Sequence, residues 1–362
     1  MKITDIRTDE ITVPLIKPFK TALRTANSIK SVLVIVETDS GEVGYGEAPP
    51  TGVITGDTIG SIKGAINEHI KKTLIGKEIE NFEDLMIKLD TSVLNNNSAK
   101  AAVEIALFDL YGKLYKAPIY KLLGGFRTEL TTDITISVND PEEMAKDSID
   151  AIKSGYKILK IKVGKDIKLD LKRMKAIREV VGDEVKLRLD ANQGWNYKEA
   201  IQAINKMEND GFNIEFIEQP VKAKDFEGLK RVTDNVGVPI MADESVFSPV
   251  DAIEIIKNKA ADLVNIKLMK TAGIRNALKI CAIAEIYEVE CMIGSMLETK
   301  LSVTAAAHLA GAKSIITKFD LDTPLLCSED PINGGIHYEG PKITLNNNYG
   351  FGISGIKSIS SI

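Results

Sequence analysis

The sequence is poor in the residues that most often carry catalysis or bind transition metals. Its 362 residues include three histidines and three cysteines. The histidines are neither paired nor in a catalytic context, so we expect them to be packing or surface residues. The cysteines lack the spacing of a metal site, and their odd number argues against a disulfide framework. A site built on histidine or cysteine is therefore not expected.

Long apolar runs and an excess of positive charge are also missing. No segment is apolar over the length that spans a bilayer, and residues 1–15 carry charges where a signal peptide needs an apolar core. The 46 Lys and Arg against 51 Asp and Glu give a net charge of −5, which offers no positive field to attract nucleic acid or anionic membranes. We therefore expect a cytoplasmic protein without nucleic-acid or membrane partners, and we also expect a homo-oligomer.

From residue 130 onward, short apolar runs alternate with amphipathic helical stretches. This βα repeat predicts an α/β barrel of the TIM type. An open doubly wound sheet is the alternative, but no predicted strand is followed by a glycine-rich nucleotide loop. The glycines of "GEVGYG" (41–46) lie in a predicted hairpin, so we attribute them to turn chemistry. The eight candidate strands are 133–138, 159–163, 185–190, 214–219, 239–244, 263–267, 290–295 and 314–320.

The regions before and after this repeat have different patterns. In the first 125 residues or so, strands such as "SVLVIVET" come before helical stretches such as "SAKAAVEIALFDLYGKLY", which indicates an α+β domain. After residue 328 the pattern weakens to short strands and turns. We predict an α+β capping domain at 1–126, a barrel at 127–325 and a segment at 326–362 that returns to the capping domain.

Charged residues occupy the carboxyl ends of the predicted barrel strands, where barrel enzymes place their sites. In "LKIKV", Lys160 and Lys162 share one face, which on a half-exposed strand would be solvated. Asp190, Glu218 and Asp243 end three successive strands and would meet at the barrel mouth. Three carboxylates without histidine or cysteine favour Mg²⁺ over Zn²⁺. The alternative is a network in which the lysines neutralise the acids.

Two lysines flank this predicted carboxylate cluster. Lys162 stands two strands before Glu218 and Lys267 two strands after it, so their amines should face each other across the barrel mouth. Lys160, together with a nearby dication, would disfavour the protonated form of Lys162, which suits a general base.

These residues stand in motifs that resemble the enolase superfamily, in its muconate-lactonizing-enzyme subgroup. Within that subgroup, "ALRT" (22–25) and "DLD" (320–322) resemble the dipeptide epimerases, close to the L-Ala-D/L-Glu epimerases. The resemblance covers nearly the whole chain. The motifs are "GEAPPTGVITGD" (46–57), "KIK" (160–162), "LDANQGW" (189–195), "EQP" (218–220), "ADES" (242–245), "NIKLMK" (265–270) and "GSMLET" (294–299).

The resemblance implies a modified (β/α)7β TIM barrel with an N-terminal capping domain. It also implies one Mg²⁺ per subunit, which Mn²⁺ can replace, and an isomerase that moves a proton at one carbon through an enediolate. The mandelate-racemase branch is disfavoured, because no histidine here could be its second base. The implied metal ligands are Asp190, Glu218 and Asp243, and the acid/base pair is Lys162 and Lys267. The implied substrate-binding residues are Arg24, Thr135, Lys160, Ser295, Met296, Glu298, Asp320 and Asp322.

The specificity residues suggest a substrate with two charged ends. By the resemblance, Asp320 and Asp322 bind the ammonium of a dipeptide, while Arg24 can bind a glutamate side-chain carboxylate bidentately. We therefore expect epimerization of L-Ala-L-Glu to L-Ala-D-Glu, a unit of bacterial wall peptides. Alternatives are muconate cycloisomerase, o-succinylbenzoate synthase or N-acylamino-acid racemase activity, a metal-free Schiff-base aldolase, and a non-catalytic binding protein.

Overall fold

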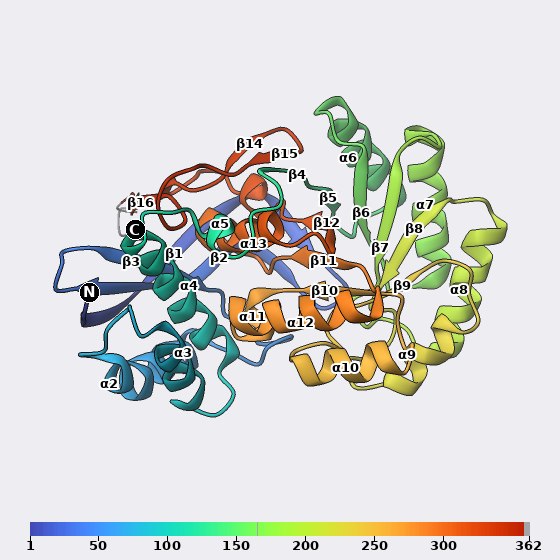
Figure 1. The fold of residues 1–362 in the computed structure, drawn as a ribbon. Coiled ribbons are helices and arrows are strands. Elements are labelled where there is room, and N and C mark those ends of the chain that lie inside the picture. The colour runs from blue at the N-terminus through green and yellow to red at the C-terminus, as the bar shows by residue number, and fades with distance from the viewer. Residues whose placement is uncertain (165, 358–362) are drawn as a thin grey trace.

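The computed structural model describes residues 1–164 and 166–357. It begins with an antiparallel sheet in the order β1-β2-β3, which lies with its helices on the left of Figure 1. The sheet forms because its strands alternate apolar and polar residues, as in β1, where Ile11 and Val13 are buried while Thr12 is exposed. The strands are β1 (Ile3–Lys20), β2 (Thr25–Thr38) and β3 (Val43–Ala48). The helices are α1 (Ile59–Gly64), the π-helix η1 (Ala65–Ile70), α2 (Lys71–Leu74), α3 (Phe82–Thr91), α4 (Asn97–Leu114) and α5 (Ile119–Leu122).

The glycines of β3 correct one sequence interpretation. Gly41 does lie in the hairpin turn, with a φ of +83°. Gly44 and Gly46, however, lie within the strand and face α4. A Cβ atom on Gly46 would stand 1.8 Å from the carbonyl oxygen of Ala102 in α4, and one on Gly44 would be 2.2 Å from that of Ala106. These two glycines therefore allow the helix to approach the sheet, and turn chemistry does not explain them.

The eight barrel strands form one parallel sheet, as the βα repeat predicts. They follow chain order from β5 to β12, and the Asp133 N–H donates to the Phe319 carbonyl at 3.3 Å, so the sheet is nearly closed. The barrel occupies the right of Figure 1. The strands are β5 (Ile134–Ile136), β6 (Ile158–Lys162), β7 (Lys186–Asp190), β8 (Ile214–Glu218), β9 (Ile240–Ala242), β10 (Leu263–Ile266), β11 (Cys291–Gly294) and β12 (Ile316–Asp320).

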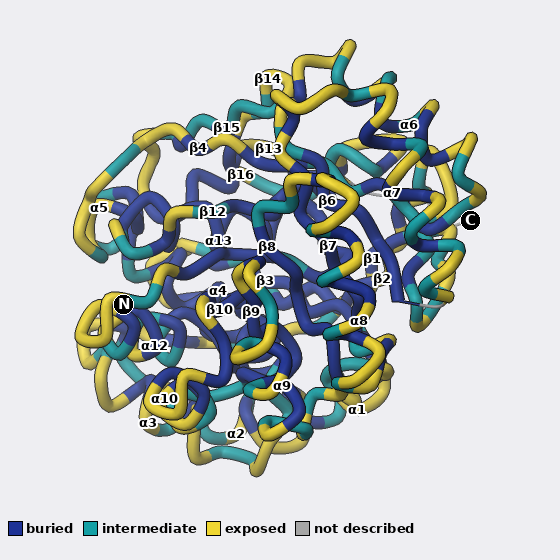
Figure 2. Tube along the Cα trace, turned by 90° about the vertical axis from the view of Figure 1, so that its right-hand side faces the viewer, coloured by how far each residue is buried: buried dark blue, intermediate teal, exposed yellow. Residues whose placement is uncertain are grey.

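Helices connect each barrel strand to the next, and the predicted (β/α)7β order is confirmed. Local caps fix where helices begin: the Asn196 side chain accepts from the Glu199 N–H, and the Glu199 carboxylate accepts from the Asn196 N–H. Dark-blue buried strands run through the centre of Figure 2, and most of its outer edge is formed by exposed or intermediate residues. The helices are α6 (Pro141–Lys153), α7 (Ile167–Val181), α8 (Tyr197–Asn209), α9 (Phe226–Thr233), α10 (Pro249–Lys257), α11 (Leu268–Thr271), α12 (Ile274–Tyr287) and α13 (Lys300–Ala312). None of the helices among the described residues combines the length and apolarity needed to cross a membrane.

The barrel interior is mostly apolar at one level, where the buried Arg188 lies in register with Phe216, and charged at the next. Phe216, Met241, Leu263 and Met292 come from four neighbouring strands and form a small separate core. Side chains two residues further along a strand point the same way, so charged residues lie above this core at the carboxyl ends. The period of two therefore turns both lysines of β6 inward.

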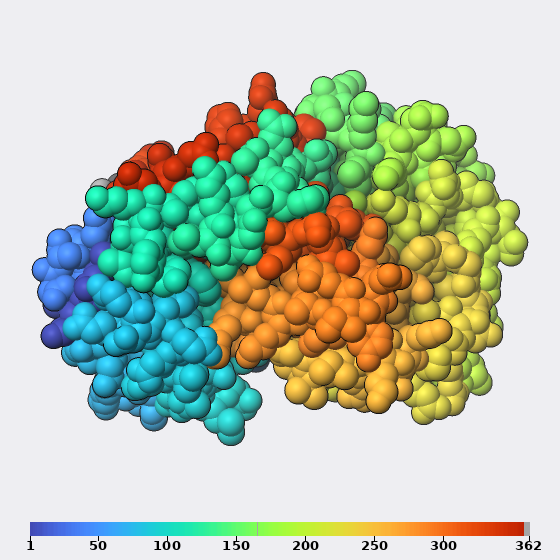
Figure 3. All heavy atoms as spheres, viewed as in Figure 1, coloured from blue at the N-terminus to red at the C-terminus, as the bar shows by residue number. Residues whose placement is uncertain are grey.

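The segment after β12 contacts the N-terminal domain. The Ile119 N–H donates to the Gly350 carbonyl at 2.9 Å, and the Phe351 N–H donates to the carboxylate of Asp109 in α4 at 2.9 Å. In Figure 3 this segment, in red, lies against the blue-green residues around α5. The domain boundaries at 126 and 325 stay a prediction. The remaining elements are β4 (Glu129–Thr131), the 3-10 helix η2 (Thr323–Leu326), β13 (Ile332–Gly334), β14 (His337–Glu339), β15 (Lys342–Thr344) and β16 (Ile353–Ile356).

His308 of α13 joins the barrel to this interface, and we expect it to make stability pH-dependent. It is fully buried beside Tyr120 and Phe351, and its Nδ1 accepts from the Tyr120 N–H at 3.2 Å. Burial lowers the pKa of His308 from 6.5 to about 3. The unfolded chain therefore binds the proton more readily, and stability falls as pH decreases from 6.5 toward 3. This group alone should lower the free energy of unfolding by about 3 kcal/mol between pH 7.5 and 4.5.

Urea unfolding of the wild type and of His308→Asn at these two pH values measures the effect. The asparagine oxygen can still accept from the Tyr120 N–H, whereas the imidazole proton site is gone. The variant should depend less on pH, and His337→Asn, at an exposed position, should behave like the wild type. An equal pH dependence in His308→Asn would contradict the assignment.

Candidate active site

The lysines of β6 point into the barrel and contact carboxylates from other strands. The Nζ of Lys162 lies 2.6 Å from Oδ2 of Asp190. The Nζ of Lys160 lies 2.6 Å from Oδ2 of Asp320, 2.7 Å from Oε2 of Glu218 and 3.3 Å from Oδ2 of Asp190. Both lysines are buried. The half-exposed strand with a solvated lysine face is thereby excluded.

Strand pairing brings the predicted metal ligands to one level of the barrel. Asp190 is paired in register with Lys162 on one side and with Glu218 on the other. Asp243 follows β9 directly, and its N–H donates to Oε1 of Gln219 at 2.9 Å. All three carboxylates are buried, and none of them lies exposed as a helix cap.

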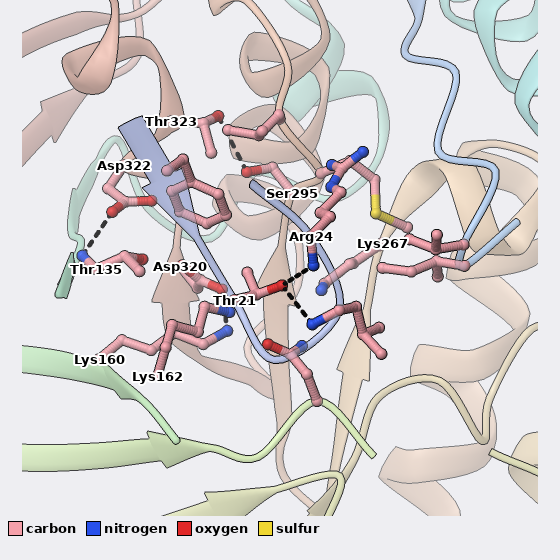
Figure 4. A pocket seen from close by; sticks show the side chains of 17 residues that line it. Thr21, Arg24, Thr135, Lys160, Lys162, Lys267, Ser295, Asp320, Asp322 and Thr323 are labelled. Atoms are coloured by element: carbon pink, nitrogen blue, oxygen red, sulfur yellow. Dashed lines mark hydrogen bonds and ion pairs between the residues drawn. The ribbon is translucent and has the colours of Figure 1, made fainter. Parts of the chain in front are cut away.

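Lys267 directly follows β10 and reaches Asp243 from the side opposite β6. Its Nζ lies 2.7 Å from Oδ2 of Asp243. Lys270, which sequence reasoning missed, lies 2.6 Å from Oδ1 of the same carboxylate and is fully buried. The one-turn helix α11 brings Lys270 back toward the strand ends. Figure 4 shows Lys162 and Lys267 pointing toward one another from opposite sides of the cavity.

The ion pairs set the protonation of this cluster. Burial disfavours the charged form of Lys160 and of Lys267. Asp320 and Glu218 nevertheless raise the pKa of Lys160 well above its usual value, and Asp243 raises the pKa of Lys267. Burial and Asp190 raise the pKa of Glu218 to about 7. Among the described residues no three carboxylates lie close enough together to hold a metal ion. Here the lysines form ion pairs with Asp190, Glu218 and Asp243, which is the alternative that the sequence left open.

The chemistry of the cluster nevertheless fits a divalent cation. Both carboxyl oxygens of Glu244, another residue missed from the sequence, are buried without a hydrogen-bond partner among the described residues. Burial and Asp243 raise the pKa of Glu244 to about 8. The carboxyl groups outnumber the ammonium groups, and the raised pKa values of Glu218 and Glu244 reflect this lack of positive charge, which a dication would supply. The carboxyl groups are Asp190, Glu218, Asp243, Glu244, Asp320 and Asp322, and the ammonium groups are Lys160, Lys162, Lys267 and Lys270.

A cavity of about 50 Å³ lies above this cluster and is partly covered by residues of the N-terminal domain. Arg24, from the turn between β1 and β2, lines it together with Val53 and Ile54. The Arg24 guanidinium forms no ion pair with a carboxylate of the described residues, and burial alone lowers its pKa. This arginine therefore offers an unused pair of donors to a bound anion.

The predicted substrate-binding residues of the barrel lie around the same cavity, with one difference. Thr135, Ser295, Met296, Asp320 and Asp322 all line it, as does Lys160. Glu298 does not line it, because its carboxylate turns back and accepts from the Met296 N–H at 2.7 Å. Glu298 thus supports the backbone of a lining residue.

The two aspartates of "DLD" differ in their partners. Asp320 is held by Lys160, whereas Asp322 accepts from the Thr135 N–H at 2.7 Å and has no ion pair among the described residues. Burial and the neighbouring Asp320 raise the pKa of Asp322 to about 6. Asp322 therefore lacks a cation on one side of the cavity, while Arg24 lacks an anion on the other (Figure 4).

Two family models together match most of the chain. The mandelate racemase/muconate lactonizing enzyme N-terminal domain matches residues 3–124, and the enolase C-terminal domain-like family matches residues 143–356. The chain belongs to the enolase superfamily. The predicted resemblance and the predicted fold class, a parallel barrel with an N-terminal capping domain, are thereby confirmed.

Several proteins similar to this enolase-superfamily chain are epimerases. It is 61% identical over 358 residues to the L-Ala-D/L-Glu epimerase of Clostridium acetobutylicum, covering 99% of this chain and 100% of that protein. A substrate-liganded complex of the L-Ala-D/L-Glu epimerase from Bacillus subtilis has a TM-score of 0.97 and 54% identity, covering 98% and 99% of the two chains. The dipeptide epimerase of Enterococcus faecalis complexed with Mg and L-Leu-L-Tyr has a TM-score of 0.95 and 43% identity, covering 98% and 100%. These relatives confirm the predicted class of enzyme, an isomerase.

Proposed function

We propose that the protein is a Mg²⁺-dependent dipeptide epimerase that converts L-Ala-L-Glu into L-Ala-D-Glu, and that it acts in the recycling or degradation of murein peptides. The observation that carries the proposal is the cavity itself, in which two lysines face each other between Arg24 and Asp322, neither of which has an ion pair among the described residues. The names of the relatives from Clostridium acetobutylicum and Bacillus subtilis support the same substrate.

The lysines would move the proton. One amine removes the α-proton of the glutamate residue, and the opposite amine returns a proton to the other face, which inverts the centre. Lys160 is buried among three carboxylates and is better suited to fix charge than to act as a base. A divalent cation held by Asp190, Glu218 and Asp243, in practice Mg²⁺ or Mn²⁺, would supply positive charge beside the substrate carboxylate and disfavour protonation of the nearby lysines.

The two ends of the cavity would select the dipeptide. Asp322 takes the ammonium of the alanine residue, with the Thr135 backbone fixing the carboxylate. Arg24 takes the side-chain carboxylate of the glutamate. A substrate of muconate cycloisomerase or o-succinylbenzoate synthase carries no ammonium for Asp322, and neither does an N-acylamino acid, so these alternatives use less of the site.

Arg24→Leu should lower kcat/KM for L-Ala-L-Glu by at least about tenfold, because a charge-assisted contact in a closed site contributes on the order of 2–5 kcal/mol. It should affect L-Ala-L-Leu much less. Asp322→Ala should impair both dipeptides, since both carry the ammonium. The measurement is kcat/KM for both substrates in the wild type and both variants. Equal losses on the two dipeptides in Arg24→Leu would show that Arg24 does not bind the glutamate side chain.

A further inference from the structure

Glu47 of β3 is fully buried, and its side chain reaches from the N-terminal domain to the barrel. It accepts from the N–H groups of Thr299 at 2.9 Å and of Ser302 at 3.2 Å, and the Thr299 hydroxyl donates to it at 2.6 Å. These donors belong to the N-cap and first turn of α13, whose partial positive charge favours a carboxylate. The start of this barrel helix is therefore fixed from the other domain.

The segment immediately before α13 forms a wall of the active-site cavity. Ser295, Met296 and Leu297 line the cavity together with Arg24, and Leu297 and Arg24 also line an adjoining surface cavity. Thr299 is only two residues beyond Leu297, so a shift of its backbone would move this wall. Glu47 holds that backbone.

Arg24 lies in the turn that joins two strands of the sheet containing Glu47. It directly precedes β2, and β2 pairs with β3 so that Leu33 lies opposite Glu47. The close approach of α4 to Gly46 leaves β3 no room to shift toward the helix. The same sheet therefore supports both the turn that holds the Arg24 guanidinium and the carboxylate of Glu47 that anchors the 295–298 wall.

We propose that Glu47 is a positioning residue that sets the distance between Arg24 and the 295–298 wall, and so determines the preference for a glutamate side chain. The inference rests on the proposed function for its substrate readout. Loss of this anchor should weaken the binding of L-Ala-L-Glu more than it slows proton transfer, because within the described part of the chain the ion pairs of the two lysines are with Asp190 and Asp243 and not with Glu47.

Two readouts test the proposal in Glu47→Gln. Amide hydrogen exchange of residues 299–302 in the substrate-free protein should rise by about tenfold or more, because Thr299 and Ser302 lose a charged acceptor. KM for L-Ala-L-Glu should rise about fivefold with kcat within about twofold, and the preference for L-Ala-L-Glu over L-Ala-L-Leu should fall by a similar factor.

Glu104→Gln is the matched control. Glu104 is also buried and also caps a barrel helix from the N-terminal domain, accepting from the Arg275 N–H at 2.7 Å, but the segment that it holds does not line the cavity. It should cost stability and leave the substrate preference unchanged. Thr299→Val removes the hydroxyl donor to Glu47 from the barrel side. It should lower the preference for L-Ala-L-Glu over L-Ala-L-Leu in the same direction, so the proposal can be tested even if Glu47→Gln fails to fold.

The outcomes separate this inference from the proposed function. Faster exchange with an unchanged preference, or an equal change of preference in Glu104→Gln, would make Glu47 a purely structural residue. Unchanged exchange at residues 299–302 would overturn the anchor whatever the substrate is. If the wild type turned over neither dipeptide, the proposed function would fail, while the exchange data would still decide whether Glu47 holds the wall.

Discussion

Removing the amine of either Lys162 or Lys267 is expected to abolish epimerization and to leave the fold in place. General acid–base catalysis contributes roughly 10²–10⁴-fold, and each direction of the reaction needs both groups, so kcat should fall by about 10³-fold or more in Lys162→Ala and in Lys267→Ala. The fold should tolerate both changes. Asp190 keeps Lys160 at 3.3 Å, and Asp243 keeps Lys270 at 2.6 Å.

Proton exchange distinguishes two bases from one. Each diastereomer, L-Ala-L-Glu and L-Ala-D-Glu, is incubated separately in D₂O, and deuterium at the α-carbon is followed by NMR. Each variant should retain slow exchange of one diastereomer at most, and the diastereomer should differ between the two variants. Lys186→Ala, an exposed lysine at the opposite end of a barrel strand, serves as the control. Full turnover by either single variant would end the two-base assignment.

Local periodicity was sufficient to predict the strands and the charges at their ends. In "LKIKV" and "VKLRLD" the period of two is unambiguous, so Lys162 and Asp190 had to share the barrel interior once a parallel sheet was assumed. The structure places them in register on neighbouring strands. Arg24 could be predicted only from the resemblance, because an arginine in a turn has no periodic context.

The residues that were missed depend on contacts that no local pattern encodes. Lys270 reaches Asp243 only because the one-turn helix α11 reverses the chain after β10. Glu47 meets Thr299 across 252 positions of sequence. Glu244 directly follows Asp243, where a strand end would turn it away from the site, yet the chain leaves the strand there and buries it among the carboxylates. Such partners follow from tertiary packing, within the barrel for Lys270 and Glu244 and between the domains for Glu47.

The pairing of lysines with carboxylates was predicted only as an alternative. This pairing affects how much positive charge the carboxyl groups still need from a metal ion. The sequence gives the number of charges at the barrel mouth, whereas distances decide which of them neutralise one another. Lys160 contacts three carboxylates at once, which no spacing along the chain could indicate. The surplus of buried carboxyl groups over ammonium groups is the physical basis for proposing Mg²⁺.

Removal of divalent cations is expected to stop turnover. EDTA should lower kcat for L-Ala-L-Glu by about 10³-fold or more, because the positive charge that stabilises the developing oxyanion would be lost. Added Mg²⁺ or Mn²⁺ should restore kcat. Binding can also be followed without activity. A cation that binds only the folded protein stabilises it by about 2.7 kcal/mol at 100 times its dissociation constant, so Mg²⁺ should raise the unfolding temperature of the chelated protein.

Glu218→Gln tests the ligand set with little change of shape. The side chain is buried, with Oε1 2.7 Å from Nδ2 of Asn265 and Oε2 2.7 Å from Nζ of Lys160. An amide can still accept from one of these donors but loses the negative charge, so both turnover and the Mg²⁺-dependent rise in unfolding temperature should disappear. Glu290→Gln, at a half-exposed ion pair with Lys318, should retain both. Undiminished turnover in a chelated, metal-free sample would rule out the metal and leave the lysine–carboxylate network as the working state of the site.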